Sequence, residues 1–246
     1  MNAFTYRQGM LCAEDLSLER IAERFATPCY VYSRAALTAA FEAYRRALAG
    51  RSARICYAVK ANSNLAILNL FARLGAGFDI VSGGELARVL VAGGKAKDVV
   101  FSGVGKTREE LQAALAEGIG CFNVESESEL TRLAGIAEQM GLVAPIALRV
   151  NPDVDAKTHP YISTGLRNNK FGIPIDEALA LYQRARMMAG IRIRGIACHI
   201  GSQLLDAAPA AEAAQKILTL ADALAAQGIV LADLDLGGGM GTFKFG

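Results

Sequence analysis

A lysine, a histidine and a run of three glycines each follow a short apolar segment that is typical of a buried β-strand. The lysine is Lys60, which ends the apolar run at residues 55–59 and is followed by the polar stretch ANSN. Such a lysine is a candidate for amine chemistry, because partial desolvation lowers the pKa of its ammonium group and frees the amine to attack a carbonyl carbon. Taken alone, it is better explained as a strand-ending side chain that reaches water. Its role therefore depends on the two other features.

The histidine is His199, in the segment ACHIGSQ at residues 197–203, again where an apolar run ends. Gly201 permits close approach of a ligand, and Ser202 offers a hydroxyl group to a phosphate. The flat imidazole of His199 can stack on an aromatic ring. A lone histidine is more often a satisfied core or surface group, so this segment indicates a site only together with its neighbours.

The glycines are Gly237, Gly238 and Gly239, which we call the glycine loop. They directly follow the predicted strand Leu-Asp-Leu at residues 234–236. Without Cβ atoms, the N–H groups of such a loop can approach and surround an anion. No Gly-Lys-Ser/Thr of a P-loop follows, and the match to GxGxxG is too poor for a dinucleotide site. The loop is a candidate phosphate site, with a tight strand-to-helix turn as the alternative.

Together these features describe a site for an aldehyde that carries an aromatic ring and a phosphate. Lys60 supplies the amine, His199 a flat ring, and Ser202 with the glycine loop the phosphate contacts. Pyridoxal 5′-phosphate (PLP) is a cofactor with these properties. The residues therefore predict PLP as the cofactor.

The elements that must position these residues alternate between short apolar runs and amphipathic helical segments, which predicts parallel strands covered by helices. Ser82, Thr107 and Ser126 each precede a glutamate by three residues, as expected at helix starts. Polar residues recur after many successive strands, which favours a (β/α)8 barrel over an open doubly wound sheet. The seven predicted strands lie at residues 55–59, 78–81, 99–102, 121–124, 146–150, 195–200 and 234–236.

The composition is that of a globular α/β protein. The 246 residues, 52% hydrophobic and 20% charged, suffice for one barrel. A net charge of +2 with scattered basic residues predicts no nucleic-acid partner. The N-terminus lacks a signal-peptide pattern and no apolar run approaches the ~18 residues of a membrane span, so we expect a cytoplasmic protein without membrane contact.

The cysteines and histidines point away from disulfides and metals. With His159 and His199 as the two histidines, we expect no metal site. The cysteines lack CxxC spacing and mostly lie in apolar runs, so we expect them to be reduced core residues. They are Cys12, Cys29, Cys56, Cys121 and Cys198.

The chain resembles the fold-type III PLP-dependent decarboxylases, and among them most closely the diaminopimelate branch. The YAVKAN and HIGSQ runs are typical of the superfamily, and the THPYISTG and NKFGI runs of the diaminopimelate branch. The matching segments keep the family's order along nearly the whole chain. They are residues 57–62, 78–85, 148–152, 158–166, 169–173, 199–203 and 237–239.

The resemblance implies roles for the candidate residues. Lys60 would carry PLP through a Schiff base, His199 would stack on its ring, and Ser202 with the glycine loop would hold its phosphate. A racemase of the same fold type ranks lower, because it lacks the NKFGI run.

Three further residues match family positions near the cofactor. Asp79 and Glu85 match acidic positions near the lysine, and Arg149 matches an arginine near the phenolic oxygen of the cofactor. Each has a structural alternative. Asp79 is equally well explained as a strand-end carboxylate and Glu85 as a helix-capping residue. Arg149 is equally well explained as a base in a surface ion pair.

The implied reaction is PLP-dependent decarboxylation of meso-2,6-diaminopimelate to L-lysine, a step of lysine biosynthesis, by a cytoplasmic homodimer. The alternatives are a decarboxylase of ornithine, arginine or carboxynorspermidine, and a PLP-binding fragment without catalysis. Family members continue past the glycine loop with an eighth barrel strand and a β-rich domain. We therefore expect an incomplete barrel over residues 34–246, no C-terminal β-domain, a separate N-terminal segment over residues 1–33, and impaired turnover by this chain.

Overall fold

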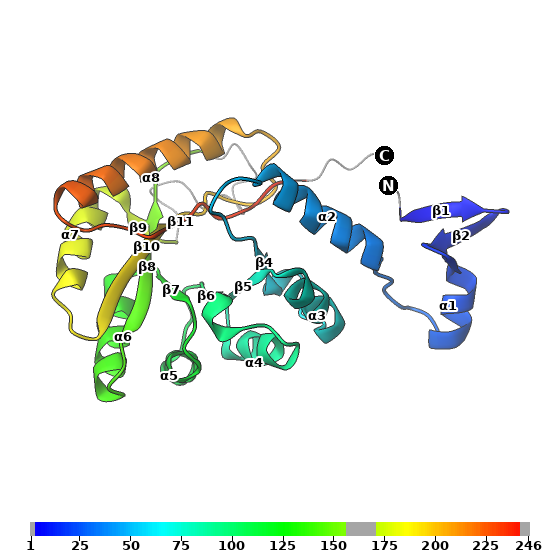
Figure 1. Ribbon diagram of the computed structural model, residues 1–246, viewed down its shortest axis with the longest axis horizontal. Helices are drawn as coiled ribbons and strands as arrows, with labels where there is room; N and C mark the ends of the chain where they lie inside the picture. The colour runs from blue at the N-terminus through cyan, green and yellow to red at the C-terminus, as the bar shows by residue number, and fades with distance from the viewer. Residues whose placement is uncertain (1–2, 156–170, 242–246) are drawn as a thin grey trace.

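The centre of the molecule is a curled parallel β-sheet with helices along its outer face (Figure 1). The computed structural model describes residues 3–155 and 171–241. The strands follow the order β11-β10-β8-β7-β6-β5-β4, and every neighbouring pair is parallel. Their bounds are β4 Cys56–Ala58, β5 Gly77–Ile80, β6 Val99–Phe101, β7 Cys121–Val124, β8 Ala144–Asn151, β10 Ile191–Ala197 and β11 Asp233–Asp235.

This sheet confirms the seven predicted strands and the incomplete barrel. The path curls from β4 to β11, and these two strands are its ends in the described part of the chain. A short strand, β9 (Ile173–Pro174), pairs with the end of β8 off this path. The protein is therefore a half-barrel with an open concave side.

The helices connect successive strands and cover the convex side of the sheet (Figure 1). Consecutive helices pack against one another from α2 to α6, and α7 packs against α8. Two short 3₁₀ turns, η1 (Val59–Ala61) and η2 (Ala96–Asp98), follow β4 and precede β6. The helices are α2 Arg34–Ala47, α3 Leu65–Leu74, α4 Gly83–Val91, α5 Arg108–Glu117, α6 Glu127–Gln139, α7 Ile175–Arg186 and α8 Ala208–Ala226.

The three predicted helix starts are confirmed, but only one forms the full reciprocal arrangement. Thr107 and Glu110 make a complete capping box at the start of α5. Ser82 and Ser126 each accept the N–H of the glutamate three residues on. The carboxylates of those two glutamates bond one residue further back, to the N–H groups of Val81 and Glu125. Each therefore ties its helix to the end of the preceding strand.

The strands have two different faces, because successive side chains of a strand point to opposite sides. The side chains under the helices are large, as in the core set of Phe78, Phe101, Phe122 and Leu148. The concave face carries small residues, which form a separate cluster, and polar residues at the strand ends. The small cluster contains Val100, Cys121, Ala147 and Ala197.

Residues 3–33 contain elements outside the parallel sheet. Strands β1 (Phe4–Arg7), β2 (Met10–Ala13) and β3 (Leu16–Ser17) make an antiparallel sheet, followed by helix α1 (Leu18–Phe25). This unit lies beyond α2, away from the half-barrel (Figure 1). Residues 29–32, whose composition is β-like, form no strand. The division at residue 33 stays a prediction.

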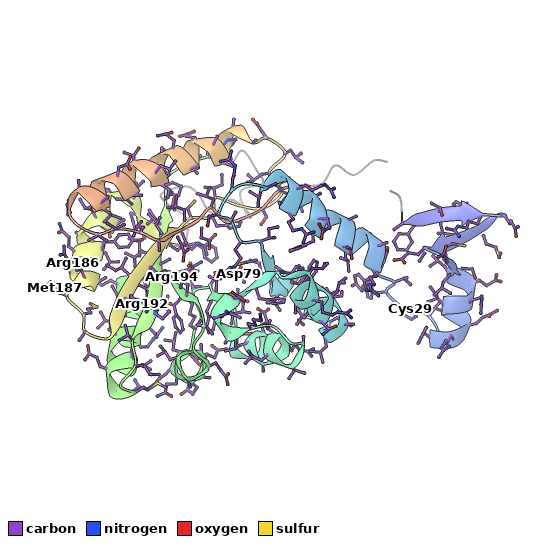
Figure 2. The ribbon with its side chains drawn as sticks, in the orientation of Figure 1. Cys29, Asp79, Arg186, Met187, Arg192 and Arg194 are labelled. Atoms are coloured by element: carbon purple, nitrogen blue, oxygen red, sulfur yellow. The ribbon has the colours of Figure 1, made fainter. Side chains whose placement is uncertain are left out.

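The cysteines follow the predicted pattern in part. All five are free; Cys12, Cys121 and Cys198 are buried, and Cys56 is half-buried. Cys29 is exposed, so its interpretation as a core residue is wrong; it lies on the linker between α1 and α2, outside the packed layers (Figure 2). Among the described residues no helix is long and apolar enough to cross a membrane.

Candidate functional site

The predicted site residues lie at one edge of the sheet, where the parallel strands end. Lys60 is in η1 directly after β4, Asp79 is in β5, and Arg149 is near the end of β8. His199 follows β10 by two residues, and the glycine loop begins two residues after β11. This edge is the one that carries the active site in barrel enzymes.

Electrostatics shows that four of these side chains are close to one another. Burial raises the pKa of Asp79 and lowers that of His199, and the positive charges of both Lys60 and Arg149 act on each of these groups in the lowering direction. Lys60 itself is exposed at the edge. The curled sheet therefore brings an accessible amine, a guanidinium, a carboxylate and an imidazole to one place.

The imidazole of His199 is uncharged at neutral pH. Burial, together with the cations of Arg149 and Lys60, lowers its pKa from 6.5 to about 4, against the opposing effect of Asp235. The Gly238 N–H points to Nδ1 at 3.4 Å, which assigns the ring proton to Nε2. A neutral, half-buried ring of this kind is suited to lie against an aromatic ligand.

We predict that His199 stays neutral in mildly acidic solution. Its ring resonances should remain unshifted from neutral pH to about pH 5 and then titrate near pH 4. In the unfolded chain the pKa of His199 stays at 6.5, so between about pH 4 and pH 6.5 the unfolded chain binds more protons than the folded one. The contribution of His199 to the free energy of unfolding is therefore lost as the pH falls from 6.5 to about 4. NMR titration beside H199Q, which identifies the resonance, checks this; titration near 6.5 would contradict it.

The glycine loop is fitted against the segment that follows β10. Gly237 and Gly239 have φ values of 72° and 89°, in the left-handed region. A Cβ on Gly237 would lie 2.6 Å from the Cys198 carbonyl oxygen, and one on Gly239 would overlap the Gly201 carbonyl oxygen. The Leu204 N–H donates to the Gly239 carbonyl at 2.8 Å. Two of the three glycines are therefore required by close backbone contact.

The middle glycine faces open space. No atom of the described residues lies within 4 Å of the position that a Cβ on Gly238 would take. Ser202 is exposed and adjoins Gly201, whose carbonyl contacts the loop. The loop therefore offers an accessible backbone beside a hydroxyl group, as an anion site requires.

This difference predicts opposite outcomes for two neighbouring alanine substitutions. Gly239→Ala should destabilise the fold by about 2–4 kcal/mol, because it adds both a strained backbone conformation and an overlap with a carbonyl. Gly238→Ala should change stability by less than about 1 kcal/mol. Urea denaturation followed by circular dichroism compares them, and equal costs would show that the loop is not held as described.

The carboxylate of Glu85 is engaged in capping. Its Oε2 accepts the Val81 N–H at 2.8 Å, while its own N–H donates to Ser82 Oγ. The predicted structural alternative is therefore present in the fold, and a role of Glu85 toward a cofactor stays a prediction.

Arg149 forms a buried ion pair with Glu125, so its reading as a surface-paired base is wrong. The Nη1–Oε1 distance is 2.9 Å, and the side chains are 13% and 1% exposed. Glu125 Oε1 also accepts the Gly103 N–H at 2.8 Å. Its Oε2 has no hydrogen-bond partner in the described part of the chain. The pair fixes the guanidinium at the strand edge, 5.3 Å from the ring of Phe171.

A hydrogen-bonded chain on the concave face joins Asp79 to residues that are not among the predicted site residues. Ser102 Oγ donates to Asp79 Oδ1 at 2.6 Å, and Asn123 Nδ2 lies 3.2 Å from Ser102 Oγ and 2.9 Å from Asp235 Oδ2. Burial, aided by the charge of Asp235, raises the pKa of Asp79 to about 6, against the Ser102 hydrogen bond. Figure 2 places Asp79 near the middle of the curl.

The sequence carries a signal for part of this series of hydrogen-bonded side chains. Asn123 is one of the recurring strand-end polar residues, and Asp235 alternates with Asp233 on a strand that leads into the glycine loop. Their contact has no local signal, because 112 residues separate them.

Some predicted features lie outside the described residues. These are His159, the run at residues 158–166, and Asn169 and Lys170 of the second diaminopimelate-like run. Among the described residues, no group of three or more potential metal ligands comes together.

Comparisons with known proteins agree with this architecture. Residues 34–245 match the family described as "Pyridoxal-dependent decarboxylase, pyridoxal binding domain". Diaminopimelate decarboxylase of Pseudomonas aeruginosa is 59% identical over 242 residues, which are 98% of this chain and 58% of that protein. The protein of the same name from Neisseria meningitidis serogroup B is 58% identical over 231 residues, 94% of this chain and 56% of that protein.

Solved structures show the same fold. Diaminopimelate decarboxylase from Helicobacter pylori, complexed with L-lysine, superposes with a TM-score of 0.90 at 47% identity, covering 92% of this chain and 57% of that one. Lysine decarboxylase from Selenomonas ruminantium gives 0.83 at 30% identity, covering 97% and 57%. This chain spans a little over half the length of these relatives. With a family match over residues 34–245 and a half-barrel that carries lysine, histidine and glycine loop at one edge, the chain belongs to the pyridoxal-dependent decarboxylases.

Proposed function

We propose that this chain provides the PLP-binding barrel of a diaminopimelate decarboxylase, which converts meso-diaminopimelate to L-lysine. The observation that carries the proposal is the convergence of Lys60, His199 and the glycine loop at the carboxyl edge of one curled sheet. The name of the 59% identical relative and the L-lysine bound to the H. pylori structure support the substrate.

The residues of the site fit PLP. The open space at Gly238 leaves room for a phosphate beside the loop, and the neutral His199 can face an aromatic ring without a charge to desolvate. The amine of Lys60 would hold the aldehyde carbon, and Ser202 with the glycine loop would hold the phosphate. When bound, PLP supplies an aldehyde that captures an amine and a ring that accepts the electron pair left by departing carbon dioxide.

The charged residues of the site would orient the ligands. Arg149, fixed by the buried Glu125, presents a cation at the position that the family resemblance assigns to the phenolic oxygen. Burial raises the pKa of Asp79 to about 6, so the group is half ionised near pH 6 and mostly a carboxylate at neutral pH, where it faces the cation of Lys60. Glu85 would contribute through the carboxylate oxygen that does not cap α4.

We further propose a cytoplasmic homodimer with a PLP-binding unit that begins at residue 34 after a separate N-terminal segment. The family match that begins at residue 34 supports this boundary. Light scattering on the purified chain tests the homodimer, and a monomer would overturn it. Limited proteolysis between α1 and α2 tests the boundary, and cleavage that unfolds the half-barrel would overturn it.

The proposed function is tested by adding PLP to the chain, reducing with borohydride and mapping the modified lysine by mass spectrometry. Carbon dioxide release is then measured with meso-diaminopimelate, lysine, ornithine and arginine. We expect the label on Lys60 and release from diaminopimelate alone, at an impaired rate. A label on another lysine, or none, would overturn the cofactor site. Faster release from ornithine or arginine would favour the related decarboxylases, and a label without release would favour a binding fragment.

A further inference from the structure

One side chain connects two strands that are not neighbours in the sheet. In the strand order, β8 and β10 separate β7 from β11. Asn123 in β7 nevertheless donates from Nδ2 to Oδ2 of Asp235 in β11, over 2.9 Å. The bond therefore crosses the concave face of the half-barrel instead of following the sheet.

Both ends of this connection reach the candidate site. On one side, Asn123 Nδ2 also lies 3.2 Å from Ser102 Oγ, which donates to Asp79 Oδ1 at 2.6 Å. On the other, Asp235 Oδ1 accepts the Gly237 N–H at 2.8 Å. We call Asp79, Ser102, Asn123 and Asp235 the cross-barrel chain. It runs from the carboxylate beside Lys60 to the first residue of the glycine loop.

The chemistry of this position favours an amide. The Nδ2 group has two hydrogens and so can donate to both Ser102 and Asp235. Asn123 is 4% exposed, so an apolar replacement would leave Asp235 Oδ2 without its donor, and a carboxylate would set two negative charges side by side. The charge of Asp235 already raises the pKa of Asp79.

The other contacts of strand β11 are to the β10 side, where its backbone pairs with β10 and Asp233 forms an ion pair with Arg194. Strand β11 comprises Asp233–Asp235, and its residues are exposed or half-buried. It pairs only with β10 in the described part of the chain. The side-chain bond to Asn123 therefore fixes a short terminal strand from which the glycine loop departs.

We propose that Asn123 is a positioning residue for the glycine loop, which sets the phosphate contacts at a fixed place relative to Lys60 and Asp79. This role rests on the proposed function, because it assumes that the loop holds the phosphate of PLP. It is a role in orienting the loop; Asn123 itself touches no reacting group.

The first test uses the chain without cofactor. Asn123→Asp replaces the donor by an acceptor of the same shape, and Asn69→Asp is its matched control, because Asn69 Nδ2 donates to the Ala92 carbonyl on the helical side. Hydrogen exchange of the amides at residues 237–241 should speed up about tenfold in N123D and stay unchanged in N69D. Unchanged exchange in N123D overturns the proposal. Amides of α5 report whether the fold is intact.

The second test compares PLP with pyridoxal, which lacks the phosphate. N123D should weaken PLP binding about tenfold while pyridoxal binding changes less than about twofold. The double variant N123D/D235N restores a donor–acceptor pair across the barrel and should recover PLP affinity. Equal loss for both ligands, or no recovery, overturns a role in phosphate positioning.

A failure of the proposed function gives a different result. If the unaltered chain binds neither PLP nor pyridoxal, the cofactor assignment fails, while the exchange measurement still decides whether Asn123 holds the loop. If N123D does not fold, Asp235→Asn provides the same exchange test. The Asp235 carboxylate accepts from both Asn123 and the Gly237 N–H, and the single amide oxygen of an asparagine cannot replace both acceptor positions.

Discussion

The variant Lys60→Ala is expected to lose all borohydride-dependent attachment of PLP at the sheet edge. Lys60 is the exposed amine directly after β4, and its charge is felt by both Asp79 and His199. Without an amine at this position, the aldehyde of PLP has no partner among the site residues described here. Mass spectrometry of the reduced protein measures the label.

Two controls separate chemistry from charge. Lys97→Ala removes an exposed lysine in η2, before β6, and should keep the label. Lys60→Arg keeps the positive charge but supplies no amine that can condense with an aldehyde, so it should lose the label while the pKa of His199 stays low. In Lys60→Ala that pKa should rise, because one of the cations that lower it is gone. A persistent label in either Lys60 variant would refute the assignment.

The largest expected effect on stability comes from Lys106→Met. The Lys106 ammonium donates to the carbonyls of Gly103 and Asn123 and pairs with Glu129 at 2.7 Å. The side chains of the pair are 0% and 5% exposed. Removing the lysine leaves a buried carboxylate without its counter-charge, which should lower the free energy of unfolding by about 3–5 kcal/mol.

The matched control is Lys216→Met in α8, because Lys216 is more exposed, pairing with Glu212 at 3.2 Å and donating to the Asp153 carbonyl at 2.9 Å. That loss should cost no more than about 1 kcal/mol. Urea denaturation followed by circular dichroism compares the two variants. K106M/E129Q, which also removes the buried charge, should recover part of the loss. If K106M costs no more than K216M, the buried pair does not carry the stability assigned to it.

The Lys106 pair also connects stability to the candidate site. Glu129 Oε2 accepts the N–H of Glu125, and the carboxylate of Glu125 holds Arg149. Lys106 bonds the carbonyl of Asn123, whose side chain spans the barrel. A K106M protein that remains folded should therefore hold Arg149 and Asn123 less firmly.

Local signals in the sequence were sufficient for the strands and for the central site residues. Apolar runs that end in a lysine, in a histidine followed by Gly-Ser, or in three glycines are readable over fewer than ten residues each. Parallel strands then place all these ends on one edge of the sheet. The sequence alone therefore predicts that Lys60, His199 and the glycine loop lie close together. The N-terminal sheet was missed, because its antiparallel strands do not follow the alternation of strands and helices from which the other strands were predicted.

The sequence by itself thus determined which elements form, which of their ends carry amine, imidazole and glycine chemistry, and which family the chain resembles. Only the tertiary structure decided how those ends are held. The burial of Arg149 on Glu125 and the contacts of Lys106 with Glu129 and Asn123 depend on the pairing of neighbouring strands. The bond of Asn123 to Asp235 depends on the curl of the sheet. Curvature arises from the packing of many residues together, so it leaves no mark on the spacing of any two of them.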